Sequence, residues 1–358
     1  MNNQWSLETH GDPLGKVHSF IRQIWLEANL NGMFVTINGN GGGRSIPRYI
    51  TEVSDISQIN PFKPLMEVNL AKHIPGILNE HPDTKIGTLL RPCEMRALIE
   101  MTKHSVLKLD NLLTISVDCL GTLPADEYQW RLERLGINKT AEEDNVTQSG
   151  DRLAHEALKF ARHGGIIHYR FRPACQVCRS PAAENADINI HVHGLPVRQV
   201  MLVTTSDPDM AKRLHFDKFT NGLADNSHIR QHERTLSKMN ERHLRTLERI
   251  KDSIANLLPA DVDAVIRQLE SCEECQSCME ACPICSVIQP KRNAHGHYNR
   301  SSVLRWLISC AGCGMCEQSC PNQLPIASFF AHIRQQLAEE WQYISGRSVD
   351  EPLPFIQS

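Results

Sequence analysis

The chain has 358 residues, of which 41% are apolar and 22% are charged, and its formal net charge is −3. This length fits two domains with a sizeable core, and the near-neutral charge gives no basis for binding nucleic acid or an anionic membrane surface. No apolar run approaches membrane-spanning length and the first residues lack a signal-peptide pattern, so we expect a cytoplasmic protein without a transmembrane segment.

Residues 1–225 are predicted to form an α/β domain. Apolar runs typical of buried strands alternate with helical stretches, a pattern that favours a mixed, largely parallel sheet. The predicted strands are residues 33–37, 86–90, 111–117, 165–172 and 198–204, and the clearest predicted helices are residues 94–104 and 151–162.

Residues 226–260 are predicted to form a linker helix that packs on the body of the protein. Charge is dense here, and apolar residues recur at helical spacing from Leu236 to Leu257 before Pro259 ends the pattern. A partner-binding coiled coil is the alternative, but the segment contains too few heptads. The remaining residues, 261–358, are cysteine-rich, with helices expected near residues 261–270, 302–309 and 325–343.

Two copies of the motif Cys-x2-Cys-x2-Cys-x3-Cys-Pro occur in this last segment. In two-cluster ferredoxins, the fourth cysteine of such a run ligates the other cluster. Zinc is the rival, but zinc sites favour separate Cys-x2-Cys pairs over runs of three. We therefore predict a helical ferredoxin domain with two 4Fe–4S clusters, one ligated by Cys272, Cys275, Cys278 and Cys320, the other by Cys310, Cys313, Cys316 and Cys282. Cys285 lies outside both motifs, and we expect a buried structural thiol there.

Four further cysteines lie in the α/β region. Cys93 and Cys119 each follow a predicted strand, and Cys175 and Cys178 follow the strand predicted at residues 165–172. If these strands are parallel neighbours, the four thiols converge at the carboxyl edge of one sheet, where open α/β sheets bind ligands. Four thiolates fit a third 4Fe–4S cluster or a zinc site, and a set of unrelated core cysteines is the plain alternative. The two neighbouring ferredoxin motifs favour iron.

A glycine-rich segment follows the first predicted strand. It comprises Asn40, Gly41, Gly42, Gly43 and Arg44. Such a segment brings backbone amides close to a diphosphate, and an arginine adds positive charge. The spacing is not a dinucleotide fingerprint, so a hairpin tip is an equally open interpretation. The pair His191 and His193 has no convincing third metal ligand, and we expect surface or core residues there.

Three stretches of the sequence resemble a known family. These are GTLLRPCEMRAL from Gly87 to Leu98, VDCLG from Val117 to Gly121, and CQVCRSPAAENADI from Cys175 to Ile188. They are similar to the beta subunits of coenzyme F420-reducing hydrogenases and formate dehydrogenases, a family that also includes flavoprotein reductases of chlorophyll metabolism. The resemblance covers roughly residues 15–205. It departs from the family at Arg91-Pro92-Cys93-Glu94, where many relatives have Thr-Pro-Cys-Gln, and in carrying the ferredoxin motifs at the C-terminal end.

The resemblance implies FAD bound beside a 4Fe–4S cluster, within a larger complex in which another subunit performs the substrate chemistry. It makes Asn69 and Arg91 further candidates for FAD binding, although Arg91 could equally form a surface ion pair. The expected function is therefore that of an oxidoreductase subunit with FAD and three 4Fe–4S clusters. Such a subunit exchanges hydride with a soluble carrier, coenzyme F420 or NAD(P), and passes electrons to a catalytic subunit of a formate dehydrogenase or hydrogenase complex.

Two other functions remain open from the sequence. One is a stand-alone FAD and iron–sulfur reductase of an organic substrate. The other is a flavin-free wiring subunit of a complex that resembles heterodisulfide reductase. The catalytic residues are not identified by any motif, and the thiolate-ligated clusters have no open coordination site for a substrate.

Overall fold

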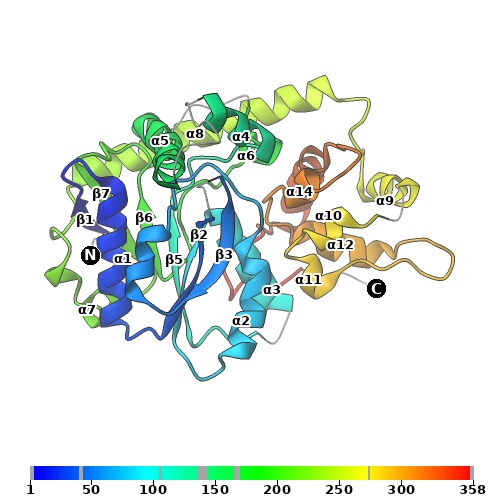
Figure 1. The fold of residues 1–358 in the computed structure, drawn as a ribbon. Coiled ribbons are helices and arrows are strands. Elements are labelled where there is room, and N and C mark those ends of the chain that lie inside the picture. The colour runs from blue at the N-terminus through cyan, green and yellow to red at the C-terminus, as the bar shows by residue number, and fades with distance from the viewer. Residues whose placement is uncertain are drawn as a thin grey trace.

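The computed structural model describes residues 4–39, 43–104, 107–134, 143–164, 170–272 and 275–354. A seven-stranded mixed sheet with its helices forms one part, and a helical cysteine-rich part lies beside it (Figure 1). The predicted class, an α/β domain with a mainly helical cysteine-rich region, is confirmed. No helix among the described residues is both long enough and apolar enough to cross a bilayer.

The sheet has the strand order β1-β7-β6-β5-β4-β2-β3. Its four central strands, β2, β4, β5 and β6, are parallel, and the three outer pairs are antiparallel. Parallel pairing is therefore confined to the middle of the sheet, where both faces are covered. The strands are β1 (Gln4–Glu8), β2 (Gly32–Asn38), β3 (Ser45–Ile50), β4 (Ile86–Leu90), β5 (Leu112–Val117), β6 (Ile188–His191) and β7 (Val200–Thr205).

The fourth central strand differs from the sequence prediction. Residues 165–169 of the predicted strand lie outside the described residues, and Arg170, Phe171 and Arg172 form no strand. The place beside β5 belongs to β6, a strand of four buried residues. Its start is fixed by Asp187, whose Oδ2 accepts hydrogen bonds from the N–H and hydroxyl of Thr114 at 2.8 Å. So short a strand gives little periodic signal in a sequence.

Helices cover both faces of the sheet. On one face, α1 buries Val17, Phe20, Ile21 and Ile24 against the strands. Asp12 caps this helix, because its Oδ1 accepts from the N–H of Gly15 at 2.9 Å. The helices of the sheet part are α1 (Pro13–Glu27), η1 (Val53–Gln58), η2 (Leu70–His73), α2 (Ile74–Glu80), α3 (Pro92–His104), α4 (Ala125–Arg134), α5 (Glu143–Ala161), α6 (Pro173–Gln176), α7 (Met210–Arg213) and η3 (Phe216–Lys218).

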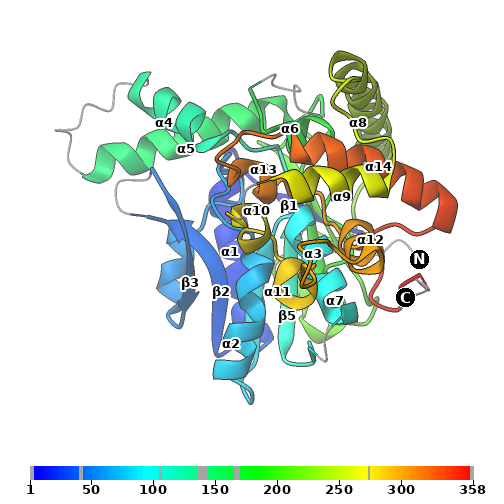
Figure 2. The same ribbon diagram turned by 90° about the vertical axis from the view of Figure 1, so that its right-hand side faces the viewer.

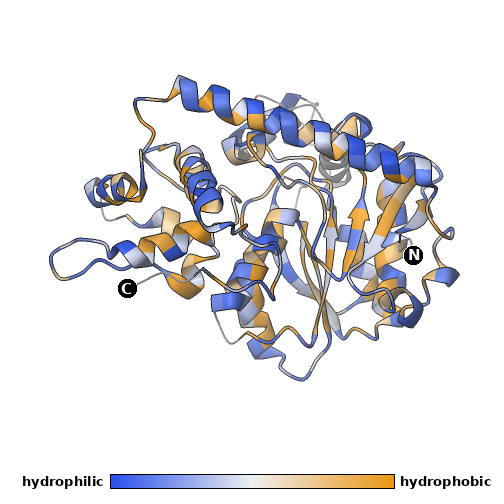
Figure 3. Ribbon diagram, turned by 180° about the vertical axis from the view of Figure 1, so that it is seen from behind, coloured by the Kyte–Doolittle hydropathy of each residue, from blue (hydrophilic) through white to orange (hydrophobic). Residues whose placement is uncertain are grey.

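A long helix, α8 (Asn226–Ser253), runs along the molecule from the sheet part toward the cysteine-rich part (Figure 1). Its outward face is polar, as Figure 3 shows, while Met239 and Leu247 are buried. The amphipathic pattern seen in the sequence therefore reflects packing on the body.

The cysteine-rich part packs on α3. Figure 2 shows α9, α10, α12 and α13 in front of α3 and the sheet. Side chains of α3, including Met95, Leu98 and Ile99, share one apolar core with Trp306 and Phe330. The helices of this part are α9 (Val262–Ser271), α10 (Ser277–Glu280), α11 (Cys285–Ile288), α12 (Arg300–Ile308), α13 (Met315–Gln318) and α14 (Ile326–Trp341).

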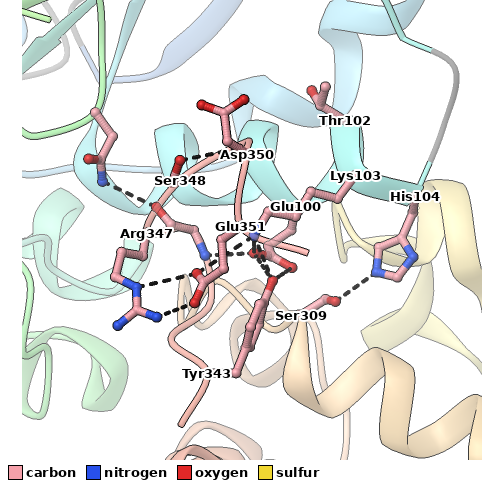
Figure 4. A network of polar contacts seen from close by, with 12 residues as sticks. Glu100, Thr102, Lys103, His104, Ser309, Tyr343, Arg347, Ser348, Asp350 and Glu351 are labelled. Carbon is pink, nitrogen blue, oxygen red and sulfur yellow. Dashed lines mark hydrogen bonds and ion pairs between the residues drawn. The ribbon is translucent and has the colours of Figure 1, made fainter. Parts of the chain in front are cut away.

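A buried carboxylate fastens the C-terminal segment to α3 (Figure 4). Glu100 is fully buried, and its oxygens accept from the Tyr343 hydroxyl at 2.6 and 2.8 Å and from the Gly346 N–H at 2.7 Å. Lys103 lies 3.2 Å from the same carboxylate and donates to the Tyr343 hydroxyl at 2.8 Å. Because a buried carboxylate needs several donors, Glu100 defines where residues 343–346 lie. We call this set of contacts the Glu100 clasp.

We predict that Glu100→Gln loosens the C-terminal segment. The amide keeps the size of the side chain but loses the charge, which leaves Lys103 without its buried partner. The free energy of unfolding should fall by about 2 kcal/mol, and trypsin should cleave after Arg347 faster than in the parent protein. Urea unfolding and timed proteolysis measure both effects. The control is Glu241→Gln, which removes an exposed ion pair with Arg245 on α8 and should change little. An unchanged cleavage rate in Glu100→Gln would contradict the clasp.

Candidate metal centres

Cysteines from three separate segments surround one small cavity at the carboxyl edge of the central strands. Cys93 begins α3 directly after β4, and Cys119 follows β5. Cys175 lies in α6 and Cys178 follows it. All four thiols line the same cavity of about 50 Å³. The structure therefore brings together the four α/β-region cysteines singled out from the sequence, and β6 supplies the strand that lies beside β5.

Three arginines lie beside these thiols. Arg91 Nη1 is 4.0 Å from Cys119 Sγ, Arg96 Nη2 is 4.0 Å from Cys178 Sγ, and Arg172 Nη2 is 3.9 Å from Cys175 Sγ. Positive charge at this distance favours the thiolate form, which is the form that binds metal. The sequence prediction identified only Arg91, and for a different role.

Each guanidinium is also held by neutral acceptors. Arg91 donates to the carbonyls of Lys63 and Leu65 at 2.7 and 2.9 Å. Arg96 donates to the carbonyl of Ser180 at 2.8 Å, and Arg172 donates to the Thr122 hydroxyl at 2.7 Å. These hydrogen bonds hold each guanidinium charge in place beside the cavity.

The pKa values of these thiols shift in different directions. Burial raises the pKa of Cys93 well above its ordinary value, and it raises the pKa of Cys119 despite the nearby Arg91. For Cys175, burial acts in the same direction, but Arg172 and a 3.2 Å contact with the Thr122 hydroxyl bring the pKa below its ordinary value. Cys175 therefore ionises more readily than Cys93 and Cys119.

The eight ferredoxin-motif cysteines form two further groups. Cys272, Cys275, Cys278 and Cys320 line one cavity of about 40 Å³, and Cys282, Cys310, Cys313 and Cys316 line another of about 20 Å³. The fourth cysteine of each motif thus lies with the first three of the other motif, as the crossed assignment requires. Each group offers four sulfur donors around one cavity, a donor set suited to an iron–sulfur cluster.

Local contacts differ between the two ferredoxin cavities. In the second, the Trp306 Nε1–H donates to Cys282 Sγ at 3.4 Å. A hydrogen bond from the buried Cys285 thiol, together with this bond, lowers the pKa of Cys282 to about 7. Cys285 is thus a buried thiol beside a predicted ligand. In the first ferredoxin cavity, burial and three neighbouring cysteines raise the pKa of Cys278 to about 11.

The second ferredoxin cavity adjoins the cavity of the α/β region. Cys313 lines both of them. The approach depends on Gly314, which has φ +69° and whose missing Cβ would lie only 2.4 Å from Ala174 Cβ. A side chain at this position would push α6 away, so the glycine sets how closely the two cysteine groups lie.

The structure describes four of the residues predicted to hold FAD, which are Gly43, Arg44, Asn69 and Arg91. Asn40, Gly41 and Gly42 lie outside the described residues. Gly43 and Arg44 end the turn that joins the antiparallel strands β2 and β3, so the described part of the segment is a hairpin connection. The Glu67 carboxylate accepts from Arg44 Nε at 3.3 Å and from the Ser45 N–H at 2.6 Å, and a phosphate would have to compete with it.

Asn69 and Arg91 lie nearer the cysteines than this hairpin. Asn69 is buried, caps η2 through its Oδ1, and lies beside Cys313, where it favours the thiolate. Arg91 faces Cys119 as described above. Both side chains therefore contact predicted cluster ligands.

A buried network around Asp118 was missed in the sequence. Asp118 accepts from the N–H groups of Ala183, Val192 and His193 at 2.8 to 3.0 Å and lies 3.3 Å from His191 Nδ1. Burial opposes ionisation of Asp118, but the neighbouring histidines outweigh it and hold the pKa of this carboxyl well below its usual range. The ligand atoms of Asp118, His191 and His232 lie within 4.8 Å of one another, but the carboxylate is already saturated by backbone donors, so we interpret the set as a structural network.

Residues 83–207 match the model of a family described as the C-terminal part of the coenzyme F420 hydrogenase/dehydrogenase beta subunit. This segment belongs to that family. The segment contains Cys93, Cys119, Cys175 and Cys178, which line the cavity of the α/β region, and also Arg91, Arg96 and Arg172. The recognition made from the sequence is thereby confirmed for this part of the chain.

Two individual proteins are similar to this chain, one in sequence and one in structure. A 50-residue stretch is 42% identical to the F420-dependent formate dehydrogenase 1 subunit beta of Methanococcus maripaludis, over 14% of this chain and 13% of that protein. The chain thus matches only a small part of this relative. A chain in the solved F420-reducing [NiFe] hydrogenase complex of Methanosarcina barkeri aligns with 71% of this chain and 94% of its own length, at 13% identity and a TM-score of 0.49.

Arg96 and Arg172 could have been found from the family segment's own sequence. Arg96 lies one helical turn after Cys93, and Arg172 stands three residues before Cys175. Both spacings place a guanidinium near a thiol. Asp118 gave a weaker signal, because its donors come from segments more than sixty residues away.

We predict that Asp118→Asn destabilises the family segment. The amide turns an N–H group toward backbone donors that the carboxylate now satisfies, so the free energy of unfolding should fall by about 2 to 4 kcal/mol. The midpoint of urea unfolding measures this. Asp126→Asn, at an exposed position on α4, is the matched control and should change the midpoint little. Equal midpoints for the two variants would show that the network contributes nothing.

Proposed function

We propose that this chain is an electron-transfer subunit of an oxidoreductase complex of the F420-dependent formate dehydrogenase or hydrogenase type. The observation that carries the proposal is the cavity of four cysteines inside the family segment, joined through Cys313 to the ferredoxin cysteines. The matched family is described as hydrogenase/dehydrogenase and the curated relative as a formate dehydrogenase protein, which supports the reaction class.

Each of the three cysteine groups would hold one 4Fe–4S cluster, and such clusters supply one-electron transfer. The chain's own residues adapt the sites to that chemistry. Arg91, Arg96 and Arg172 offset the negative charge of the first thiolate set. Trp306 donates a hydrogen bond to a sulfur of the second ferredoxin set. Charge and hydrogen bonds to sulfur both raise the reduction potential of such a site.

The organisation of the chain follows from this division of roles. We propose a FAD and 4Fe–4S domain at residues 1–225, a linker at residues 226–260 and a ferredoxin domain at residues 261–358. Formate or hydrogen chemistry would belong to a partner catalytic subunit. A reducing cytoplasm suits thirteen unpaired cysteines, so we propose that location.

FAD is the proposed converter between two-electron and one-electron transfer, and a soluble hydride carrier is its proposed partner. The family name of the matched segment supports coenzyme F420 as the first choice of carrier, with NAD(P) as the second. Arg44 on the β2–β3 hairpin is the described residue that the glycine-rich segment offers for a phosphate.

Metal analysis tests the cluster assignment. Anaerobically purified protein should contain about twelve iron and twelve sulfide atoms per chain, as three clusters of four irons require. Cys93→Ser should lower both values by about four and leave the ferredoxin pair, because Cys93 lies only in the first cavity. Cys282→Ser should disturb the cluster of Cys310, Cys313 and Cys316. An iron content near eight in the parent protein, or zinc in place of iron, would contradict the proposal.

Reduction by each carrier in turn tests the proposed function. The isolated chain, kept anaerobic, should have its bound flavin bleached by reduced coenzyme F420 and should oxidise neither formate nor hydrogen. Hydride transfer needs only an accessible flavin, whereas the other substrates need a catalytic subunit. Stopped-flow absorbance follows the bleaching. Rapid bleaching by NADH alone would reject the deazaflavin carrier, and formate oxidation by the isolated chain would reject the division between subunits.

A further inference from the structure

The two ferredoxin motifs are an internal repeat, so each residue around one cysteine group has an equivalent around the other. Aligning Cys272 with Cys310 also brings the fourth cysteines, Cys282 and Cys320, into register. The two ferredoxin cavities lie close together, because Phe330 lines both of them. A difference between equivalent positions is therefore a difference between two neighbouring sites that have the same four ligand atoms.

Hydrogen bonds to sulfur differ between the two sites. In the second ferredoxin cavity, the Trp306 Nε1–H donates to Cys282 Sγ at 3.4 Å, and the buried Cys285 thiol donates to the same sulfur. Trp306 is 1% exposed, and its ring meets that of Phe330 edge to face at 4.9 Å, so its N–H is held in place. One ligand sulfur of this site therefore accepts from two neutral donors.

Glutamines stand at the equivalent positions around the first ferredoxin cavity. Gln268 is the equivalent of Trp306, and its Nε2 donates to the carbonyl of Leu257 at 3.1 Å. Gln323 is the equivalent of Cys285 and is exposed to solvent. Neither glutamine donates to Cys320 Sγ among the residues that the structure describes. The repeat therefore keeps the ligands but not the donors to sulfur.

Acidic residues are also distributed unequally between the two motifs. The second motif contains one, Glu317, whose carboxylate accepts from the N–H of Ala327 at 2.7 Å. The first motif contains three acidic residues, Glu273, Glu274 and Glu280, the first two of which lie outside the described residues. Negative charge close to an iron–sulfur site opposes its reduction, because reduction adds an electron.

Arg334 on α14 adds positive charge to the second ferredoxin site. Its Nη1 lies only 2.7 Å from the place that a Cβ of Gly312 would take, so this approach depends on the glycine. The guanidinium favours the thiolate form of the adjacent Cys310. Arg96 also contacts this motif, where it donates to the carbonyl of Ala311 at 3.2 Å.

The first motif has cationic neighbours as well, but fewer for its acidic residues. Arg292 donates to the carbonyl of Cys272 at 3.3 Å, and Lys72 donates to the carbonyl of Glu280. Two cations thus accompany three carboxylates at the first motif. The guanidinium groups that contact the second motif, which has one carboxylate, are those of Arg96, Arg172 and Arg334.

Burial acts in the opposite direction to these hydrogen bonds and charges. Cys313 and Cys316 of the second ferredoxin site are each 9% exposed, whereas Cys275 of the first is exposed. Burial disfavours the negative charge that reduction adds, so it would make the second site the harder one to reduce. The same low dielectric, however, strengthens each hydrogen bond and each charge that acts there. The donors and guanidinium groups therefore act where their effect is largest.

We propose that Trp306, Cys285 and Arg334 hold the reduction potential of the second ferredoxin site above that of the first. They are positioning residues, because they act through Cys282 and Cys310. The inference rests on the proposed function, since it needs a 4Fe–4S cluster in each cavity. An electron then passes from the first ferredoxin site, which is oxidised, to the second, which is reduced by that electron.

This order gives the row of sites a direction. Cys313 lines both the second ferredoxin cavity and the cavity of the α/β region, so the site of higher potential is the one beside the α/β part. The site of lower potential carries the exposed Cys275 and is the one that an external electron donor can approach. Electrons that enter there move inward toward the α/β part.

A redox titration of the anaerobically purified full-length chain, followed by electron paramagnetic resonance, tests the proposal. Of the two ferredoxin signals, the one with the higher midpoint potential should respond to Trp306→Phe and to Cys285→Ala. Each change removes one hydrogen bond to Cys282 Sγ and should lower the equilibrium constant for reduction about tenfold, which is about 59 mV for one electron. Arg334→Gln should lower the same midpoint. The signal that Cys93→Ser removes belongs to the α/β region and is set aside.

Rescue and matched controls separate tuning of the potential from a loss of packing. Cys285→Ser keeps a donor and should retain the parent midpoint, whereas a purely structural role would not distinguish it from Cys285→Ala by potential. Gln268→Leu and Gln323→Ala change the equivalent positions of the first motif and should leave both ferredoxin midpoints unchanged.

Two results would overturn the inference while the proposed function stands. One is a higher midpoint for the ferredoxin signal that Trp306→Phe does not shift. The other is parent midpoints in Trp306→Phe, Cys285→Ala and Arg334→Gln alike. Iron and sulfide are measured in the same samples, so a chain with fewer than two ferredoxin clusters would instead overturn the proposed function together with this inference.

Discussion

The attraction between arginines and partly buried thiols is the interaction on which the rest of this structure depends. Four thiols in one small cavity cannot ionise together without nearby positive charge, because burial and mutual repulsion both oppose the thiolate form. Arg91, Arg96 and Arg172 supply that charge from three segments. Their remaining donors bind backbone carbonyls and side-chain oxygens, so the same groups also hold the loops that carry the cysteines.

Two of these arginines also join the sheet part to the cysteine-rich part. Arg96 donates to the carbonyl of Ala311 at 3.2 Å, and Arg172 donates to Gln318 Oε1 at 2.9 Å. Ala311 and Gln318 lie between cysteines of the second ferredoxin motif. Arg96 and Arg172 thus place positive charge beside the thiols of the α/β-region cavity and also hold that cavity next to the second ferredoxin cavity. Gly314 permits the close approach.

Helix α3 links these features. Its first turn carries Cys93 at the sheet edge, Arg96 lies near Cys178, and its last turns carry Glu100 and Lys103 of the Glu100 clasp. Its apolar side packs on the ferredoxin helices. A buried carboxylate, a half-buried arginine and an apolar face on one helix therefore position the cysteine-bearing edge of the sheet and the apolar core shared with the cysteine-rich part. Substitutions in α3 are accordingly expected to affect several sites together.

The sequence by itself determined the cysteine groups that depend on local spacing or on strand order. The motif runs specified which ferredoxin cysteines belong together, because three cysteines at three-residue steps must share one loop. Cys93 and Cys119 were predicted to meet because parallel strands end at the same edge of a sheet. The α/β class and the long helix α8 followed from hydrophobic periodicity in the same way.

Only the tertiary structure decided which charges and cavities surround those cysteines. The four-residue strand β6 is too short to be read from periodicity. The backbone donors that bind Asp118 and Glu100, and the carbonyls that accept from Arg96, lie between sixty and more than two hundred residues away along the chain. The sequence also left the hairpin and phosphate interpretations of the glycine-rich segment open. Contacts of this kind arise when distant segments pack, and their energies depend on burial and geometry that no local pattern records.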